Sequence, residues 1–163
     1  MNMFDFIEYF KNVTAENKMA AAEGFTFTTC SGTGYLEEVL QQFRRSANFV
    51  CVSDTAQGTY FERGGGFYQR RVVTIHFLSR YAHGDMTDYR RALDRSRELC
   101  RQFVSRIIAD TEALRSELIF FNTGDIRTND LGGEFVNGAT GRVMMFSIDE
   151  PTCLCYNNDE WNK

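Results

Sequence analysis

The hydrophobic and polar positions between Tyr68 and Tyr81 predict one long strand. β-Branched and aromatic residues are frequent there, and successive side chains fall into two alternating sets. One face carries Arg71, Val73, Ile75 and Phe77, and the other carries Arg70, Val72, Thr74, His76 and Leu78. Both sets are apolar at their middle, so we expect the centre of this strand to be buried on both sides.

An amphipathic helix is predicted after a tight connection that contains Gly84. Asp85, Thr87 and Asp88 are candidate N-caps, because their oxygens can accept hydrogen bonds from the free N–H groups of a first helical turn. Apolar residues then recur at spacings of three and four, which predicts a helix of about six turns with one buried stripe. The stripe consists of Ala92, Ser96, Leu99, Cys100, Phe103, Val104, Ile107 and Ile108.

The chain before this unit alternates between helical and extended patterns. We expect an N-terminal helix that ends near Gly24, a strand over Phe25–Cys30, a second helix and a strand over Phe49–Asp54. Three glycines at residues 64–66 then separate two aromatic segments, which predicts a hairpin whose second arm is the long strand. The apolar positions of the two helices are Met3, Phe6, Ile7, Phe10 and Val13 in the first, and Leu36, Val39, Leu40 and Phe43 in the second.

The chain after the long helix is mostly extended. Glu117–Asn122 and Arg142–Asp149 read as strands, and Pro151 ends the second. The segment between them is rich in glycine and poor in apolar residues, which predicts a long excursion or an irregular hairpin. The tail from Cys153 allows one more short strand before the chain end.

The fold class that these elements predict is α+β. Adjacent strands favour an antiparallel or mixed β-sheet packed by two or three helices. With 163 residues, of which 43% are hydrophobic and 14% aromatic, the chain can bury a core without metals or disulfides. No internal repeat or linker marks a boundary, so we expect a single domain over residues 1–163.

Positive charge is concentrated between Arg63 and Arg106. This segment holds ten arginines and four acids, a local net charge of +6 that leaves −10 on the rest of the chain. Opposite charges on different parts of one chain suit a head-to-tail contact between copies. The candidates for this subunit contact are four arginines of the long helix, Arg90, Arg91, Arg97 and Arg101.

Two alternatives explain the same arginines. A solvated helix face would pair Arg90 with Asp94 and Glu98 with Arg101 at helical spacing. Nucleic-acid binding through the basic helix is the other alternative.

The five cysteines show no disulfide framework. They are odd in number, and Cys51 and Cys100 lie within apolar patterns, so we expect reduced cysteines that pack as small hydrophobes. Cys30 is a candidate nucleophile, because it ends a strand before a helix N-terminus, where a thiol pKa is lowered. No His or Asp close to it in sequence provides a base, and a buried structural thiol is the alternative.

The remaining motifs each lack a part that their chemistry requires. Gly32 and Gly34 form G-x-G between a strand and a helix, but Glu37 occupies the third position of the dinucleotide-binding fingerprint. Cys153 and Cys155 have no second pair with which to bind zinc.

Two further groups of residues contain metal-ligand types. A site on His76 and His83 would need Asp85 as well. The acids Asp125, Asp130 and Glu134 have the wrong spacing for a calcium loop. We therefore expect no enzyme activity, with no catalytic residue, no metal and no cofactor.

The N-terminal segment does not resemble a signal peptide or a membrane anchor, because Asp5 and Glu8 interrupt its apolar run. No run of 18 apolar residues occurs elsewhere. We expect a soluble cytoplasmic protein that does not contact a membrane.

The order of the elements, the chain length and the segment GEFVNGATGRVMMFSIDEPTCLCYN resemble the small neck and tail proteins of long-tailed bacteriophages and prophages, in particular the tail terminator family. The resemblance implies an α+β protein that forms a ring, typically a hexamer. Such a ring docks on the end of the tail tube, stops its polymerisation and presents a surface to the head-tail connector protein. It also implies a location first in the cytoplasm of a bacterial host and then in the virion.

The segments expected to contact the partners are the glycine hairpin and the Gly-rich segment, since both are long and little constrained by core burial. The candidate residues are Arg63, Gly64, Gly65, Gly66, Asn129 and Asp130. Three alternatives stay open, namely another head-tail joining protein of the neck, a small cytosolic enzyme and a nucleic-acid-binding module. We expect no sequence-specific binding of nucleic acid.

Overall fold

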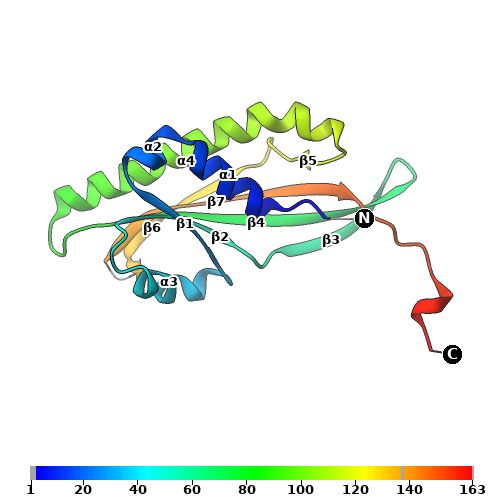
Figure 1. The fold of residues 1–163 in the computed structure, drawn as a ribbon, viewed down its shortest axis with the longest axis horizontal. Helices are drawn as coiled ribbons and strands as arrows, with labels where there is room; N and C mark the ends of the chain where they lie inside the picture. The colour runs from blue at the N-terminus through cyan, green and yellow to red at the C-terminus, as the bar shows by residue number, and fades with distance from the viewer. Residues whose placement is uncertain (1–2, 137, 163) are drawn as a thin grey trace.

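The computed structural model describes residues 3–136 and 138–162, without the side chains of Thr33 and residues 133–136. Figure 1 shows a sheet with helices on both faces. The elements are α1 Phe6–Glu16, α2 Lys18–Ala22, β1 Phe25–Cys30, η1 Thr33–Tyr35, α3 Leu36–Gln42, β2 Asn48–Ser53, β3 Gln57–Arg63, β4 Gly66–Arg80, α4 Met86–Ser116, β5 Phe120–Phe121, β6 Arg127–Val136, β7 Ala139–Pro151 and η2 Asn158–Glu160.

The strands form one mixed sheet of seven strands, with the order β1-β2-β4-β7-β5. β1 and β2 are parallel, and the other pairs are antiparallel. β3 also pairs with β4, toward its start, and β6 also pairs with β7. The prediction of a single α+β domain with a mixed sheet packed by helices is therefore confirmed.

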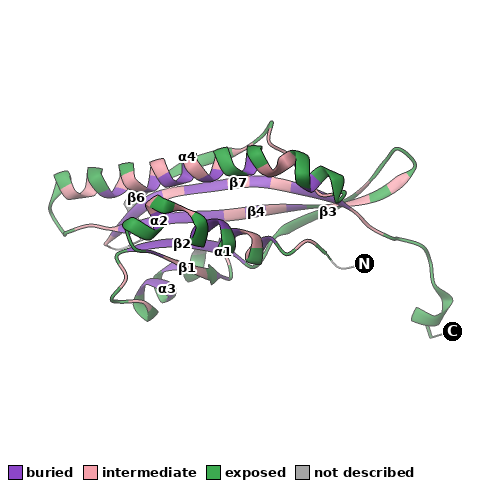
Figure 2. Ribbon diagram, turned by 45° about the horizontal axis from the view of Figure 1, so that its top comes forward, coloured by how far each residue is buried: buried purple, intermediate pink, exposed green. Residues whose placement is uncertain are grey.

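Each face of the sheet has its own core. On one face, α1, α2 and α4 cover the larger cluster, which includes Phe10, Ile75, Phe103 and Phe146. On the other face, α3 covers a smaller cluster that lies toward the end of β4, around Phe49 and Leu78. The purple strand centres of Figure 2 lie between these layers. No helix of the described residues covers the rest of the α3 face, and this leaves the hairpin end of the sheet open.

The centre of β4 is buried on both faces, as its sequence predicted. Val73, Ile75 and Phe77 belong to the larger cluster, whereas Leu78 belongs to the smaller one and His76 is also buried. β4 pairs with β7 along almost its whole length, from Tyr68–Pro151 to Arg80–Ala139.

Gly141 of β7 makes this pairing possible. It lies opposite Leu78, and a Cβ atom at this position would overlap the carbonyl oxygen of Phe77. No side chain fits there without displacing the backbone of β4.

The expected N-terminal helix is split in two at Asn17. This residue has extended backbone angles, and its side chain accepts a hydrogen bond of 2.7 Å from the N–H of Ala20, so it caps α2. The prediction of one continuous helix was wrong, because the Asn side chain offers the backbone a local alternative.

The long helix exceeds the predicted six turns, since α4 has 31 residues. Its apolar stripe continues to the buried Leu114. α4 ends where the N–H of Ile119 bonds the carbonyl of Leu114 and the N–H of Leu118 bonds that of Arg115, a Schellman motif. Leu118 takes the left-handed conformation, with φ 64°, that glycine usually adopts, so no glycine marks the end of α4.

Two further predictions need correction. The strand expected over Glu117–Asn122 is reduced to Phe120–Phe121, because the helix and its terminal turn take the residues before it. Residues 152–162 of the tail add no strand, and instead they hold the short turn η2. The segment before β7 is an irregular hairpin, as one of the two alternatives predicted, with a register shift between Leu131 and Val136.

Gly141→Ala is expected to lower the free energy of unfolding by more than about 3 kcal/mol, because the new methyl group meets the backbone of β4. Chemical denaturation measures this loss. Gly132→Ala is the matched control in the same hairpin, where nothing lies within 4 Å of the added Cβ. Equal effects of the two substitutions would contradict the close approach.

Candidate functional site

An arginine-aromatic ladder lies on the open sheet face at the hairpin end. We use this name for Phe61, Arg63, Tyr68, Arg70 and Phe120, which come from β3, β4 and β5. Strand pairing brings them together. Phe61 of β3 lies opposite Tyr68 of β4, and a single strand, β7, lies between β4 and β5. None of the five belongs to the cluster under α3.

The hairpin turn sets the position of Arg63. Gly64 and Gly65 both have positive φ, 61° and 79°, and they connect the paired residues Arg63 and Gly66. A two-residue turn with positive φ at both positions matches the twist of the strands, and glycine adopts it without strain. The turn therefore holds the end of β3 firmly against β4.

Guanidinium groups and rings contact one another along the ladder. The Arg63 guanidinium carbon lies 4.6 Å from the Tyr68 ring centroid and 4.8 Å from that of Phe120. The rings of Phe61 and Tyr68 stack with centroids 5.7 Å apart, and the Arg70 guanidinium lies 5.1 Å from the Phe61 ring. Tyr, Phe and Arg are the residue types that protein interfaces favour.

The two arginines of the ladder differ in their electrostatics. Arg70 donates two hydrogen bonds, of 2.7 and 2.8 Å, to the fully buried carboxylate of Asp149. Arg63 has no acidic partner within the described part of the chain. Arg63 is also exposed, so its charge remains available to a partner.

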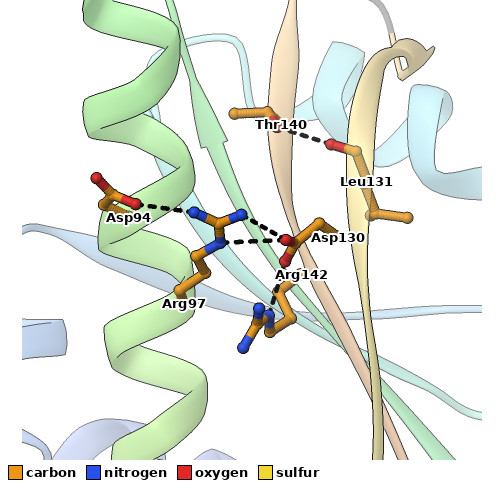
Figure 3. A network of polar contacts seen from close by, with 6 residues as sticks. All are labelled: Asp94, Arg97, Asp130, Leu131, Thr140 and Arg142. Atoms are coloured by element: carbon orange, nitrogen blue, oxygen red, sulfur yellow. Dashed lines mark hydrogen bonds and ion pairs between the residues drawn. The ribbon is translucent and has the colours of Figure 1, made fainter.

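A second polar cluster clamps α4 to the β6–β7 hairpin (Figure 3). The guanidinium of Arg97 lies 2.6 Å from Asp130 and 3.1 Å from Asp94, and Arg142 bonds the other oxygen of Asp130 at 2.7 Å. Hydrogen bonds from Arg97 and Arg142 lower the pKa of Asp130 to about 2. Asp130 is thus an ionised anchor between three elements.

The residues predicted for partner and subunit contacts are separated by this arrangement. Asp130 and Arg97 bond each other within the chain, whereas Arg63 and the turn glycines project at the opposite end with the hairpin. Asn129 is exposed. It precedes Asp130 along β6, so the two side chains point to opposite faces of the sheet. The assignment of these residues to partner and subunit contacts stays a prediction.

The arginines of α4 are mostly paired. Arg101 bonds Glu98, as the solvated-face alternative predicted. Asp94, however, pairs with Arg97 and not with Arg90.

Six of the ten arginines between Arg63 and Arg106 have acidic partners among the described residues, and these are Arg70, Arg71, Arg95, Arg97, Arg101 and Arg106. Five of the acids, Glu16, Glu23, Asp130, Asp149 and Glu150, come from distant parts of the sequence. Much of the charge division seen in the sequence is therefore neutralised within the chain. Arg90 and Arg91 are exposed at the start of α4.

A third cluster forms around Cys30. The strand order places Cys51 of β2 opposite His76 of β4, and β1 brings Cys30 beside them. A hydrogen bond from Cys51 and a further one from His76 lower the pKa of Cys30 to about 5, and the shared proton raises the pKa of Cys51. Sequence reasoning missed this histidine, because it lies 46 positions away and only strand pairing reveals it.

This cluster has the chemistry of an activated thiol but little access to solvent. A thiolate next to an imidazole can act as a nucleophile. The exposed fraction of Cys30 is 4% and that of His76 is 1%. A surface concavity of about 350 Å³ begins beside it, at Gly32, Ser53 and Thr74, but the sulfur itself is covered.

The other motifs remain apart. Cys153 and Cys155 are exposed in the tail, and Gly32 has positive φ in a turn next to η1. Asp85 caps α4 by accepting from the N–H groups of Thr87 and Asp88. The side chain of Glu134 lies outside the described residues. Within the described part of the chain, no three His, Cys, Asp or Glu side chains are grouped as metal ligands would be.

The sequence matches no protein family, and no curated protein is significantly similar to it. Among the residues described, no helix has the length and apolar character needed to cross a bilayer.

Asp130→Asn is expected to lower the free energy of unfolding by about 1 kcal/mol at neutral pH, because two arginines lose their shared anion. Folding depresses the pKa of Asp130, so this stability is present above about pH 4 and is lost as the pH falls through about 2. Denaturation at several pH values should show the difference from wild type shrinking over that window. Asp125→Asn, in an exposed local pair with Arg127, serves as the control with a much smaller effect.

In a Cys153→Ser/Cys155→Ser background, ultraviolet thiolate absorbance should titrate with a midpoint at about 5, which is the pKa of Cys30. Cys100 stays silent in this range, since burial raises its pKa to about 11. Cys51→Ala removes the main hydrogen-bond donor and should move the midpoint upward, whereas Cys51→Ser keeps a donor and should move it less. An unchanged midpoint in Cys51→Ala would contradict the pairing.

Proposed function

We propose that this protein is a structural assembly protein, a ring-forming tail terminator of a long-tailed phage or prophage. In this role, copies of the chain close into a ring that caps the tail tube and joins it to the head connector. The observation that carries the proposal is the uncovered arginine-aromatic ladder at one end of the molecule, beside a projecting hairpin and tail.

The ladder has the composition of an interface centre but no cover of its own. Phe61, Tyr68 and Phe120 are half-buried by one another, and Arg63 is exposed above two of the rings. A partner that excluded water here would strengthen both the cation–π contacts and any charged hydrogen bond to Arg63. Contact with other protein chains therefore accounts for this surface better than solvation does.

The remainder of the surface favours assembly over nucleic-acid binding. Acidic partners on the same chain neutralise Arg95, Arg97, Arg101 and Arg106, so α4 does not present a continuous basic stripe. The net charge of −4 further disfavours contact with phosphates.

A thiol-dependent enzyme is the second candidate, and the Cys30–His76 contact is the observation in its favour. Such an enzyme would have to expose Cys30, for example by moving α3 away from the sheet. The two functions can be separated by substitution: Cys30→Ala would abolish thiol chemistry, whereas assembly should survive it.

The test is to polymerise a tail-tube protein of a long-tailed phage, with and without the purified protein, and to measure tube lengths by electron microscopy. We expect shorter tubes with a ring at one end. Arg63→Ala should require about tenfold more protein for the same effect, as loss of an interface anchor does. Glu112→Ala, on the exposed face of α4, is the control that should behave as wild type. Tubes of unchanged length would contradict the proposal.

A further inference from the structure

The C-terminal tail, residues 152–162, leaves the sheet and stands clear of it (Figure 1). Thr152 is still held to β4, because its N–H donates a 2.9 Å hydrogen bond to the carbonyl of Phe67. Beyond it, large apolar side chains are exposed: Leu154 by 45%, Tyr156 by 65% and Trp161 by 61%. Among the described rings, Tyr156 and Trp161 stack only on each other, with ring centroids 6.1 Å apart.

The tail and the ladder are chemically complementary. The tail carries Asp159 and Glu160, and neither forms an ion pair within the described part of the chain. The ladder carries Arg63, which also lacks an acidic partner there. Aromatic rings flank the charges on both sides, at Tyr156 and Trp161 in the tail and at Tyr68 and Phe120 in the ladder. Unpaired opposite charges beside uncovered rings favour mutual contact.

The direction of the tail favours another copy of the chain as the recipient. β7 ends with Pro151 opposite Tyr68, so the tail begins beside its own ladder. The bond from Thr152 to Phe67 fixes the exit direction, and the following residues lead away from the sheet to the turn η2. The eleven residues can extend about 35 Å, which is enough to reach across a neighbouring subunit.

We propose that the tail of one copy binds the arginine-aromatic ladder of the next copy. Asp159 and Glu160 bond Arg63 of the neighbour, and the tail aromatics cover its Tyr68 and Phe120. Each copy gives a tail and receives one, a head-to-tail contact that closes into a ring. This inference rests on the proposed function in one respect, namely that copies of the chain are neighbours in a ring.

Disulfide trapping tests the contact, because the exposed cysteines Cys153 and Cys155 already lie in the tail and the other three are buried. Thr59→Cys places a thiol on the exposed edge strand, two residues from Phe61 on the same face. Under mild oxidation of mixed tagged and untagged full-length chains, we expect disulfides between different chains. Glu112→Cys, exposed on α4, is the matched control and should cross-link at least about tenfold less.

The cross-links must require the tail cysteines, so Cys153→Ser/Cys155→Ser should abolish them. Disulfides formed only within one chain would overturn the proposal, since the tail would then cover its own ladder. Equal cross-linking of Thr59→Cys and Glu112→Cys would overturn it as well.

Charge exchange tests the ion pairs separately. Arg63→Glu should weaken association of the copies about tenfold, measured by sedimentation, and Asp159→Arg/Glu160→Arg in the same chain should restore it. A ring that forms normally in Arg63→Glu, and terminates tubes, would overturn the tail contact and leave the proposed function standing. A wild-type chain that caps no tube but still shows tail-dependent cross-links would support the tail contact and contradict the proposed function.

Discussion

The antiparallel pairing of β4 with β7 is the constraint on which the rest of the structure depends. It runs from Tyr68–Pro151 to Arg80–Ala139, and Gly141 is the residue that lets the two backbones approach. β2 and β3 then occupy successive parts of the other edge of β4, and β5 and β6 occupy the other edge of β7. The helices bury the centre of this pair, so the side chains that remain uncovered are those at its hairpin end.

Ion pairs hold most of the arginines discussed above within the fold and leave Arg63 available to a partner. Arg71 bonds the buried Glu150 at 2.9 Å and donates to the carbonyl of Phe4, which ties the N-terminal segment to the sheet. On α4, Arg97 and Arg106 are held by carboxylates from β6 and α1. Buried and networked pairs of this kind specify how the elements meet more than they stabilise the fold. Arg63 differs from them, because its charge lies over the rings of Tyr68 and Phe120 and has no acidic partner among the described residues.

Local patterns were sufficient to predict the elements that have strong periodicity. The alternation in β4 and the glycines at Gly64 and Gly65 gave the strand and its hairpin, because both signals are contained in a few neighbouring residues. The break at Asn17 and the end of α4 at Leu118 escaped prediction, since they use residues without a strong stop signal. The ladder and the Cys30–His76 contact could not be found, because each joins strands whose order in the sheet the sequence does not reveal.

The tail continues directly from β7, and this has a mechanical consequence. Tension applied to the tail acts along the strand axis, whereas the hydrogen bonds of an antiparallel ladder lie perpendicular to the strands. All the bonds between β7 and β4 then share the load in shear, and none is opened first as in unzipping. A subunit held by its tail would therefore transmit force into the centre of its own sheet and resist extraction.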